Sequence, residues 1–259
     1  MSAQLAQDLL GLLSGSFVGF SLGLVGGGGS ILAVPLMIYV VGVASPHVAI
    51  GTSALAVAVN AAANLVSHAR AGTVKWSCAG VFAAAGIAGA FAGSTLSKIV
   101  DGRHLLAAFA VLMLAVAGIM FFRRGSTGDA AVQLNRGNFP RLLATGVGTG
   151  TLSGFFGIGG GFLIVPSLMF ATGMPIICAV GSSLVAVTAF GATAATNYAI
   201  SGLVSWRLAL AFIAGGVLGG LAGGRLAHVL GGKRGALNTV FAAIIALTAV
   251  YMLARSTLG

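Results

Sequence analysis

The stretch GLVGGGGSILAVPLM, Gly23 to Met37, places four consecutive glycines and, six residues later, a proline inside a strongly apolar chain. Glycine lowers helix stability because it costs backbone entropy, and proline removes a backbone N–H. A segment of this composition predicts a break between two helices. The rest of the sequence indicates the environment in which that break lies.

The composition is that of an integral membrane protein. Of the 259 residues, 58% are hydrophobic and 6% are charged, and the mean hydropathy is +1.08, whereas soluble domains carry about 25% charged residues. Apolar runs long enough for a membrane helix or half-helix recur at 5–25, 30–44, 48–69, 76–97, 104–122, 141–156, 161–173, 177–199, 206–228 and 235–254. We therefore expect an all-α polytopic fold in the lipid bilayer, with nothing cleaved from an N-terminus that lacks a basic signal region.

The glycine-rich stretch occurs twice. GFFGIGGGFLIVPSL, from Gly154 to Leu168, matches the first stretch at seven of fifteen positions. Later motifs repeat at an offset one residue shorter, GTSALAVAV as GSSLVAVTA and GTVKW as GLVSW. The chain is therefore read as a tandem duplication, with an N-terminal repeat at 1–125, a polar linker at 126–139 and a C-terminal repeat at 140–259.

Five apolar segments per repeat imply that the second repeat is inverted relative to the first. With this count, nine Lys and Arg residues fall on one side of the membrane and four on the other, a bias that places the central linker in the cytoplasm and both termini outside. Treating the first two segments of each repeat as a re-entrant pair gives the same sidedness. The net charge of +10 is read as this topology signal rather than as a nucleic-acid surface.

The two glycine clusters are the first candidate site. Consecutive glycines should end one helix and open the N-terminus of the next, near Ser30, where backbone N–H groups and the helix dipole favour an anion. Pro35 and Pro166 are expected to break the following helices again. The predicted substrate-binding residues here are Gly26, Gly27, Gly28, Gly29, Ser30, Gly157, Gly159, Gly160 and Gly161. By contrast, the four-residue spacing of Gly11, Gly15, Gly19 and Gly23, and of Gly146, Gly150 and Gly154, indicates close helix packing.

Polar residues of the third segment in each repeat complete the candidate site: Thr52, Ser53, Asn64, Ser182 and Ser183. Two interpretations of the hydroxyls stay open, namely lining of the site and hydrogen bonding to a preceding backbone carbonyl. The chain has no glutamate, and its aspartates are Asp8, Asp101 and Asp129 near segment ends or in the linker. A missing carboxylate at membrane depth argues against a cationic substrate and favours an anion.

No motif points to a cofactor, a metal site or an enzyme. The cysteines Cys78 and Cys178 lie inside apolar segments, no nucleotide loop follows the glycines, and a hydrolase Gly-x-Ser-Gly motif is absent. The expected partners are a small anionic substrate and the lipid bilayer, with no nucleic acid. Homo-oligomerisation stays open.

At these residues the chain resembles the sulfite exporter TauE/SafE family, also called TSUP. The resemblance lies in the doubled GxGGGxxxxP signature at Gly26 to Pro35 and Gly157 to Pro166, and in the GTS and GSS that open the third segments. It implies a bacterial inner-membrane secondary transporter, commonly an exporter, for small sulfur-containing or organic anions such as sulfite, sulfonates or sulfoacetate.

Two mechanisms are compatible with these features. In the first, alternating access, one repeat rocks against the other around a central anion. The alternative is a passive anion channel with the same pore residues.

Overall fold

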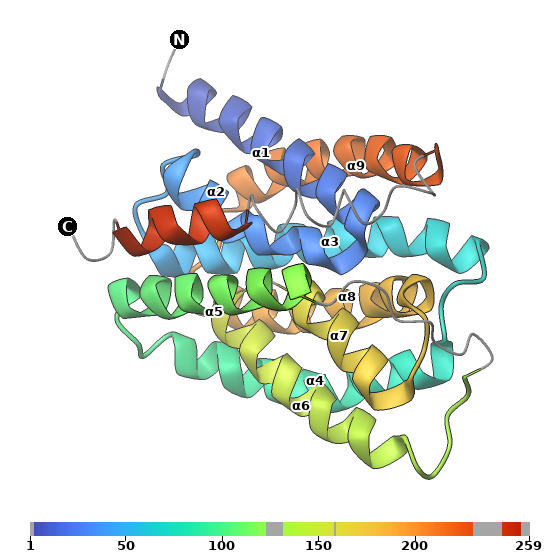
Figure 1. Cartoon of the computed structure of the whole chain (residues 1–259). Coiled ribbons are helices and arrows are strands. Elements are labelled where there is room, and N and C mark those ends of the chain that lie inside the picture. The colour runs from blue at the N-terminus through green and yellow to red at the C-terminus, as the bar shows by residue number, and fades with distance from the viewer. Residues whose placement is uncertain (1–2, 123–131, 158, 230–244, 255–259) are drawn as a thin grey trace.

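The structure is a computed structural model that describes residues 3–122, 132–157, 159–229 and 245–254 (Figure 1). These residues form helices and no strand. The helices are α1 (Ala3–Val25), the 3₁₀ helix η1 (Gly26–Leu32), α2 (Ala33–Tyr39), α3 (Pro46–Arg70), α4 (Trp76–Ser97), α5 (Gly102–Phe122), α6 (Phe139–Phe156), α7 (Gly161–Thr172), α8 (Ile176–Ile200), α9 (Trp206–Val229) and a last segment, Ile245–Ala254. Five of them are long and apolar enough to cross a membrane. The expected all-α polytopic membrane fold is confirmed.

The first helix of each repeat packs on the fourth helix of the other repeat. α1 lies along α9, and a β-carbon added at Gly19 would stand 1.9 Å from the carbonyl oxygen of Gly216. α6 lies along α4 in the same way, and a β-carbon at Gly150 would stand 2.2 Å from the carbonyl oxygen of Gly86. Gly19 and Gly150 are equivalent in the sequence repeat, as are Gly86 and Gly216. The glycine rows are therefore packing surfaces, as their spacing indicates.

The order of these contacts gives the helix directions. Along α1, Gly15 faces Phe212 and Gly19 faces Gly216, so α1 and α9 run parallel. Along α6, Gly146 faces Phe82 and Gly150 faces Gly86, so α4 and α6 also run parallel. Because α4 follows directly on the end of α3, α4 and α6 begin at the end of the molecule where α3 finishes.

Hydrogen bonds near the helix starts complete this orientation. Thr52, near the start of α3, bonds to Ser205 just before α9, and Ser182, near the start of α8, bonds to Lys75 just before α4. α1, α3 and α9 therefore begin at one end, and α4, α6 and α8 begin at the other. Equivalent helices of the two repeats run in opposite directions, which is the arrangement that an inverted repeat requires.

The α1–α9 and α4–α6 contacts define two groups of helices that cut across the sequence repeats. One group holds α1, η1, α2, α3 and α9, and the other holds α4, α6, α7 and α8. The fourth helix of each repeat thus packs in the group of the other repeat, and α3 and α8 pack on each other across the two groups. Figure 1 shows α3 and α8 running between the α1–α9 pair and the α4–α6 pair.

At the end where α4 and α8 finish, a polar network joins these two helices. The Lys98 ammonium donates to Oδ1 of Asn197 at 2.8 Å and to Oγ of Ser201 at 2.9 Å, and Nδ2 of Asn197 donates to Oγ of Ser94 at 2.7 Å. The buried Asn197 amide is thus satisfied within the protein, and the positive charge lies beside the carbonyl-rich helix C-termini that favour it.

The expectation that both prolines break their helices is wrong. α2 continues through Pro35 to Tyr39, and α7 continues through Pro166 to Thr172. Pro35 lies in the first turn, where the missing N–H would have no intrahelical acceptor. Pro166 removes one hydrogen bond inside α7, and packing of α7 against α6 and α8 holds the helix together.

Parts of the expected linker and final segment lie outside the described residues. Of the predicted linker 126–139, residues 126–131 are not described, and α6 begins at Phe139. Residues 230–244 and 255–259 of the C-terminal repeat are also outside the described part of the chain.

We predict that Gly150→Ala destabilises the protein while Gly148→Ala, on the same helix, does not. The new methyl group at Gly150 would meet the backbone of Gly86, whereas nothing lies within 4 Å of a β-carbon at Gly148. Overpacking of this kind costs about 1–3 kcal/mol. Thermal unfolding in detergent, followed by intrinsic fluorescence, measures the difference, and equal losses in both variants would contradict the packing described here.

Candidate functional site

The second glycine cluster is a sharp break between α6 and α7. Gly157, Gly159 and Gly160 have φ values of 64°, 64° and 67°, in the left-handed region that favours glycine. Gly157 ends α6, and Gly160 immediately precedes α7, which has no side-chain cap at its start. Gly160 has no side chain that could cap α7, and the first N–H groups of this helix carry the positive end of the helix dipole.

Gly159 lies at the centre of the molecule. A β-carbon there would stand 2.8 Å from Cγ1 of Val57 and 2.9 Å from Cγ1 of Val187. Val57 is the twelfth of the 25 residues of α3, and Val187 is the twelfth of the 25 residues of α8. These two valines are equivalent in the sequence repeat. The break therefore lies midway along both central helices and between matching positions of the two repeats.

The first glycine cluster has a different conformation. Gly26–Leu32 form the 3₁₀ helix η1, and α2 begins only at Ala33. α1 does end at Val25, where the glycines predict a helix end, but the next α-helix begins at Ala33 rather than near Ser30, because Gly26–Leu32 form a 3₁₀ helix. Ser30 is fully buried. η1 packs against both α1 and α7, so the two glycine clusters do lie next to each other.

Two of the predicted site hydroxyls cap helices of the opposite repeat. Oγ1 of Thr52 accepts a hydrogen bond from the backbone N–H of Ser205 at 2.9 Å, just before α9. Oγ of Ser182 accepts one from the backbone N–H of Lys75 at 2.9 Å, just before α4. Thr52 and Ser182 are equivalent residues, and they satisfy equivalent orphan donors.

Their neighbours bond locally instead. Ser53 donates to the carbonyl oxygen of Ala49 at 2.6 Å, and Ser183 donates to that of Val180 at 2.7 Å. This is the back-bonding to a preceding turn that the sequence left open as one of two interpretations.

The structure does not gather the third-segment residues around the glycine break. Thr52 and Ser182 each precede by five residues the valine that contacts Gly159, a distance of about 8 Å along the helix axis. Because α3 and α8 are antiparallel, the two side chains lie on opposite sides of Gly159 along the helix direction. Asn64 lies farther along α3, where its Nδ2 donates to the backbone carbonyl of Asn60 at 2.8 Å and its amide packs on Gly220 of α9.

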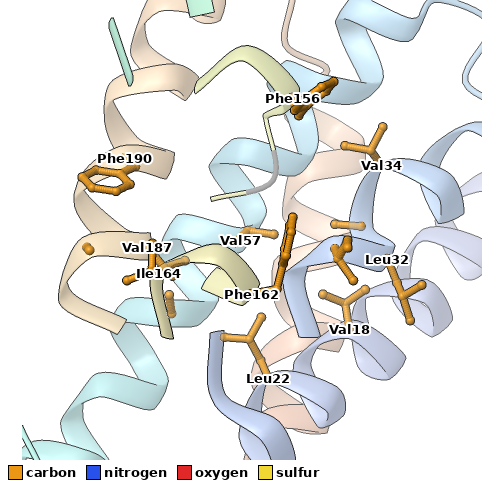
Figure 2. Close-up of a cluster of buried hydrophobic side chains, with 14 of the residues drawn as sticks. Val18, Leu22, Leu32, Val34, Val57, Phe156, Phe162, Ile164, Val187 and Phe190 are labelled. Atoms are coloured by element: carbon orange, nitrogen blue, oxygen red, sulfur yellow. The ribbon is translucent and has the colours of Figure 1, made fainter. Parts of the chain in front are cut away.

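Apolar side chains fill the space around the break. In Figure 2, Phe162 of α7 lies in the middle of the cluster, with Val57 on one side, Val18 and Leu32 on the other, and Leu22 below it in this view. No predicted site residue lines either of two cavities of about 410 and 440 Å³. Val57, Phe162 and Val187 are all buried, so apolar side chains close the centre of the structure.

Three buried polar side chains that the sequence did not select, Ser14, Asn60 and Ser153, have no hydrogen-bond partner among the described residues, and two of them lie near the helix interfaces discussed above. Oγ of Ser153, on the last turn of α6, faces the start of α7, and a β-carbon at Gly160 would stand 2.8 Å from it. The amide of Asn60 is fully buried against Gly216 of α9. The repeat could not reveal either residue, because the equivalent positions are Leu22 and Phe190.

The described carboxylates lie away from this region. Asp8 is near the start of α1, where it accepts from Nε of Arg207 at 3.0 Å, and Asp101 is exposed in the loop before α5. The chain's third acidic residue, Asp129, falls outside the described residues. In the described core, positive helix-end potential is therefore not offset by carboxylates.

The fold and the site define a polytopic helical membrane protein built on a duplicated, glycine-broken helix motif. The family model of the sulfite exporter TauE/SafE matches residues 11–252, and the chain belongs to this family. Members are membrane transporters, which agrees with the class that the sequence predicts.

Relatives are described as probable membrane transporters. A probable membrane transporter protein of Xylella fastidiosa strain Temecula1 is 51% identical over 245 residues, covering 94% of each chain. The probable membrane transporter protein YunE of Bacillus subtilis strain 168 is 28% identical over 238 residues, covering 83% of this chain and 85% of YunE. No solved structure matches the chain.

We predict that Thr52→Val lowers stability, and by more than Thr52→Ser does. Valine keeps the shape but leaves the Ser205 N–H without its acceptor, and an unsatisfied buried donor costs about 1–3 kcal/mol. Thr52→Ser keeps the hydroxyl and loses only a buried methyl group, so the thermal unfolding midpoints of the wild type and the two variants in detergent separate the cap from the packing. Identical midpoints would show that the hydrogen bond contributes nothing.

Proposed function

We propose that this protein is a secondary transporter that exports small organic or sulfur-containing anions, such as sulfite, sulfonates or sulfoacetate. The observation that carries the proposal is the position of Gly159, a left-handed glycine at the start of a broken helix, midway along α3 and α8 and between two equivalent valines. Interrupted helices at the interface of two repeats are the usual substrate site of secondary transporters.

An anion suits this position better than a cation. Helix N-termini present N–H donors and positive potential, and a glycine backbone can be approached closely. The apolar surroundings strengthen such an interaction, because a low dielectric screens charge less than water does. Sulfite and sulfonates offer the several acceptor oxygens that convergent N–H groups can bind, and the family name supports this substrate class.

Alternating access in this fold would move packing groups rather than sequence repeats. The α1–α9 and α4–α6 contacts are backbone to backbone, so each pair should move as one body. The interface between the groups runs along α3 and α8 and includes the contact of η1 with α7. Movement along that interface would separate Val57 from Val187 and expose the glycine break to one side at a time.

The charge distribution supports a cytoplasmic linker and external termini. Arg70, Lys75 and Arg141 lie at the end where α4 and α6 begin, and Lys98 and Arg207 lie at the opposite end. The positive-inside rule assigns the first end to the cytoplasm of a bacterial plasma membrane.

The alternative function, a passive anion channel, uses the same residues. It differs from the transporter in requiring a continuous path for the anion across the membrane.

We predict that proteoliposomes containing the purified protein show saturable counterflow of ³⁵S-labelled sulfite or sulfoacetate, and that Gly159→Ala abolishes it. The substitution strains a left-handed residue and inserts a methyl group between Val57 and Val187. Gly173→Ala is the matched control, since Gly173 has a φ of 74° at the other end of α7 and nothing within 4 Å.

The assay separates the two functions. Unsaturable flux without counterflow would favour the channel. Absence of flux for every sulfur oxyanion and organic acid tested would overturn the proposed function. Equal loss in both glycine variants would attribute the effect to backbone strain and overturn the assignment of Gly159.

A further inference from the structure

The structure distinguishes the two glycine breaks from each other. Both breaks follow a helix of similar sequence, but only the second contains a buried side chain with unused hydrogen-bonding capacity among the described residues around it. Ser153 is 1% exposed, and its hydroxyl has no partner. A serine in a helix can ordinarily bond to the carbonyl four residues before it, so an unpartnered hydroxyl here calls for an explanation.

The Ser153 hydroxyl points at the turn that opens α7. A β-carbon at Gly160 would lie 2.6 Å from Cβ and 2.8 Å from Oγ of Ser153. Gly160 immediately precedes α7, a helix of 12 residues without a side-chain cap. The hydroxyl therefore lies beside the residue from which the first N–H groups of α7 follow.

The first break lacks this arrangement. A β-carbon at Gly29 would meet the backbone of Leu22 and the Cβ of Ser21. Leu22, the repeat equivalent of Ser153, has no polar atom in its side chain, and the Ser21 hydroxyl already donates to the carbonyl of Phe17 at 2.9 Å. The first break leads into the 3₁₀ helix η1, and the α-helix α2 begins only after it, at Ala33.

We propose that the substrate anion binds at the second break alone, with Ser153 as a substrate-contacting residue that donates its hydroxyl hydrogen to an anion oxygen beside the start of α7. This inference rests on the proposed transport of an oxyanion and assigns it to one of the two breaks. The ligand class is a sulfite or sulfonate head group, whose oxygens can accept from the hydroxyl and from backbone N–H groups together. The two repeats would then have different roles, since the first supplies packing and the second binds the substrate.

The test is ligand-induced thermal stabilisation of the full-length protein in detergent, titrated with sulfoacetate and with sulfite, for the wild type, Ser153→Ala and Ser21→Ala. Ser153→Ala removes a hydroxyl that bonds to no protein group, so its unfolding midpoint without ligand should equal or exceed that of the wild type. Its apparent Kd should rise about tenfold or more, the usual loss for one hydrogen bond to a charged group. Ser21→Ala removes the corresponding hydroxyl at the first break and should leave the apparent Kd unchanged.

Each outcome decides a separate point. An unchanged apparent Kd in Ser153→Ala, with a wild type that responds to sulfonates, would overturn the role of Ser153 and leave the proposed function standing. An equal loss of affinity in Ser21→Ala would overturn the assignment to the second break. A wild type that neither binds nor transports any sulfur oxyanion would overturn the proposed function and this inference with it.

Discussion

Direct contact between glycine backbones is the interaction on which the rest of the structure depends. Lipid solvates apolar side chains as well as protein does, so membrane helices gain little from hydrophobic burial and associate through close packing. The rows of α1 and α9, and of α6 and α4, bring carbonyl oxygens within about 2 Å of where a β-carbon would lie. No other residue type permits that approach, and the contacts recur at equivalent residues of the two repeats.

Exchange of the fourth helix follows from these contacts and ties the repeats into one body. α4 lies against α6 and α9 lies against α1, so neither repeat completes its own packing. The hydroxyls of Thr52 and Ser182 reinforce the exchange by capping the start of the helix that comes from the other repeat. In a medium without water these caps satisfy donors that would otherwise be buried without a partner. The same four helices thereby position α3 and α8, which hold the glycine break between Val57 and Val187.

The centre of the molecule combines apolar side chains with the positive end of the α7 helix dipole. Phe162 and the valines are buried there, while the side chain of Ser153 lies against Gly160, which precedes α7. Lys98 and Asn197 bind each other at one end of α4 and α8, away from this centre, and stabilise the helix ends rather than the site.

Local composition was enough to predict the membrane helices, the duplication and the glycine breaks. The signals were apolar runs of about 20 residues, small residues at every fourth position and consecutive glycines. Each of them acts through the chain's own backbone or through the lipid, so its effect is the same whichever helix lies beside it. The family signature came from the same residues. These features did not depend on which helix lies beside which.

Only the tertiary structure decided what each polar group does. Thr52 and Ser53 are adjacent in sequence, yet one caps α9 and the other bonds to its own helix, because α3 turns them toward different neighbours. Ser153 carries no sequence signal, since its repeat equivalent is Leu22, and its importance comes from an unpartnered hydroxyl facing Gly160. The η1 and α7 segments diverge despite similar glycines, because left-handed conformations at Gly157, Gly159 and Gly160 depend on the packing of Ile50, Val57 and Val187 around them. Partners far apart in the chain determine these contacts, and no local pattern encodes them.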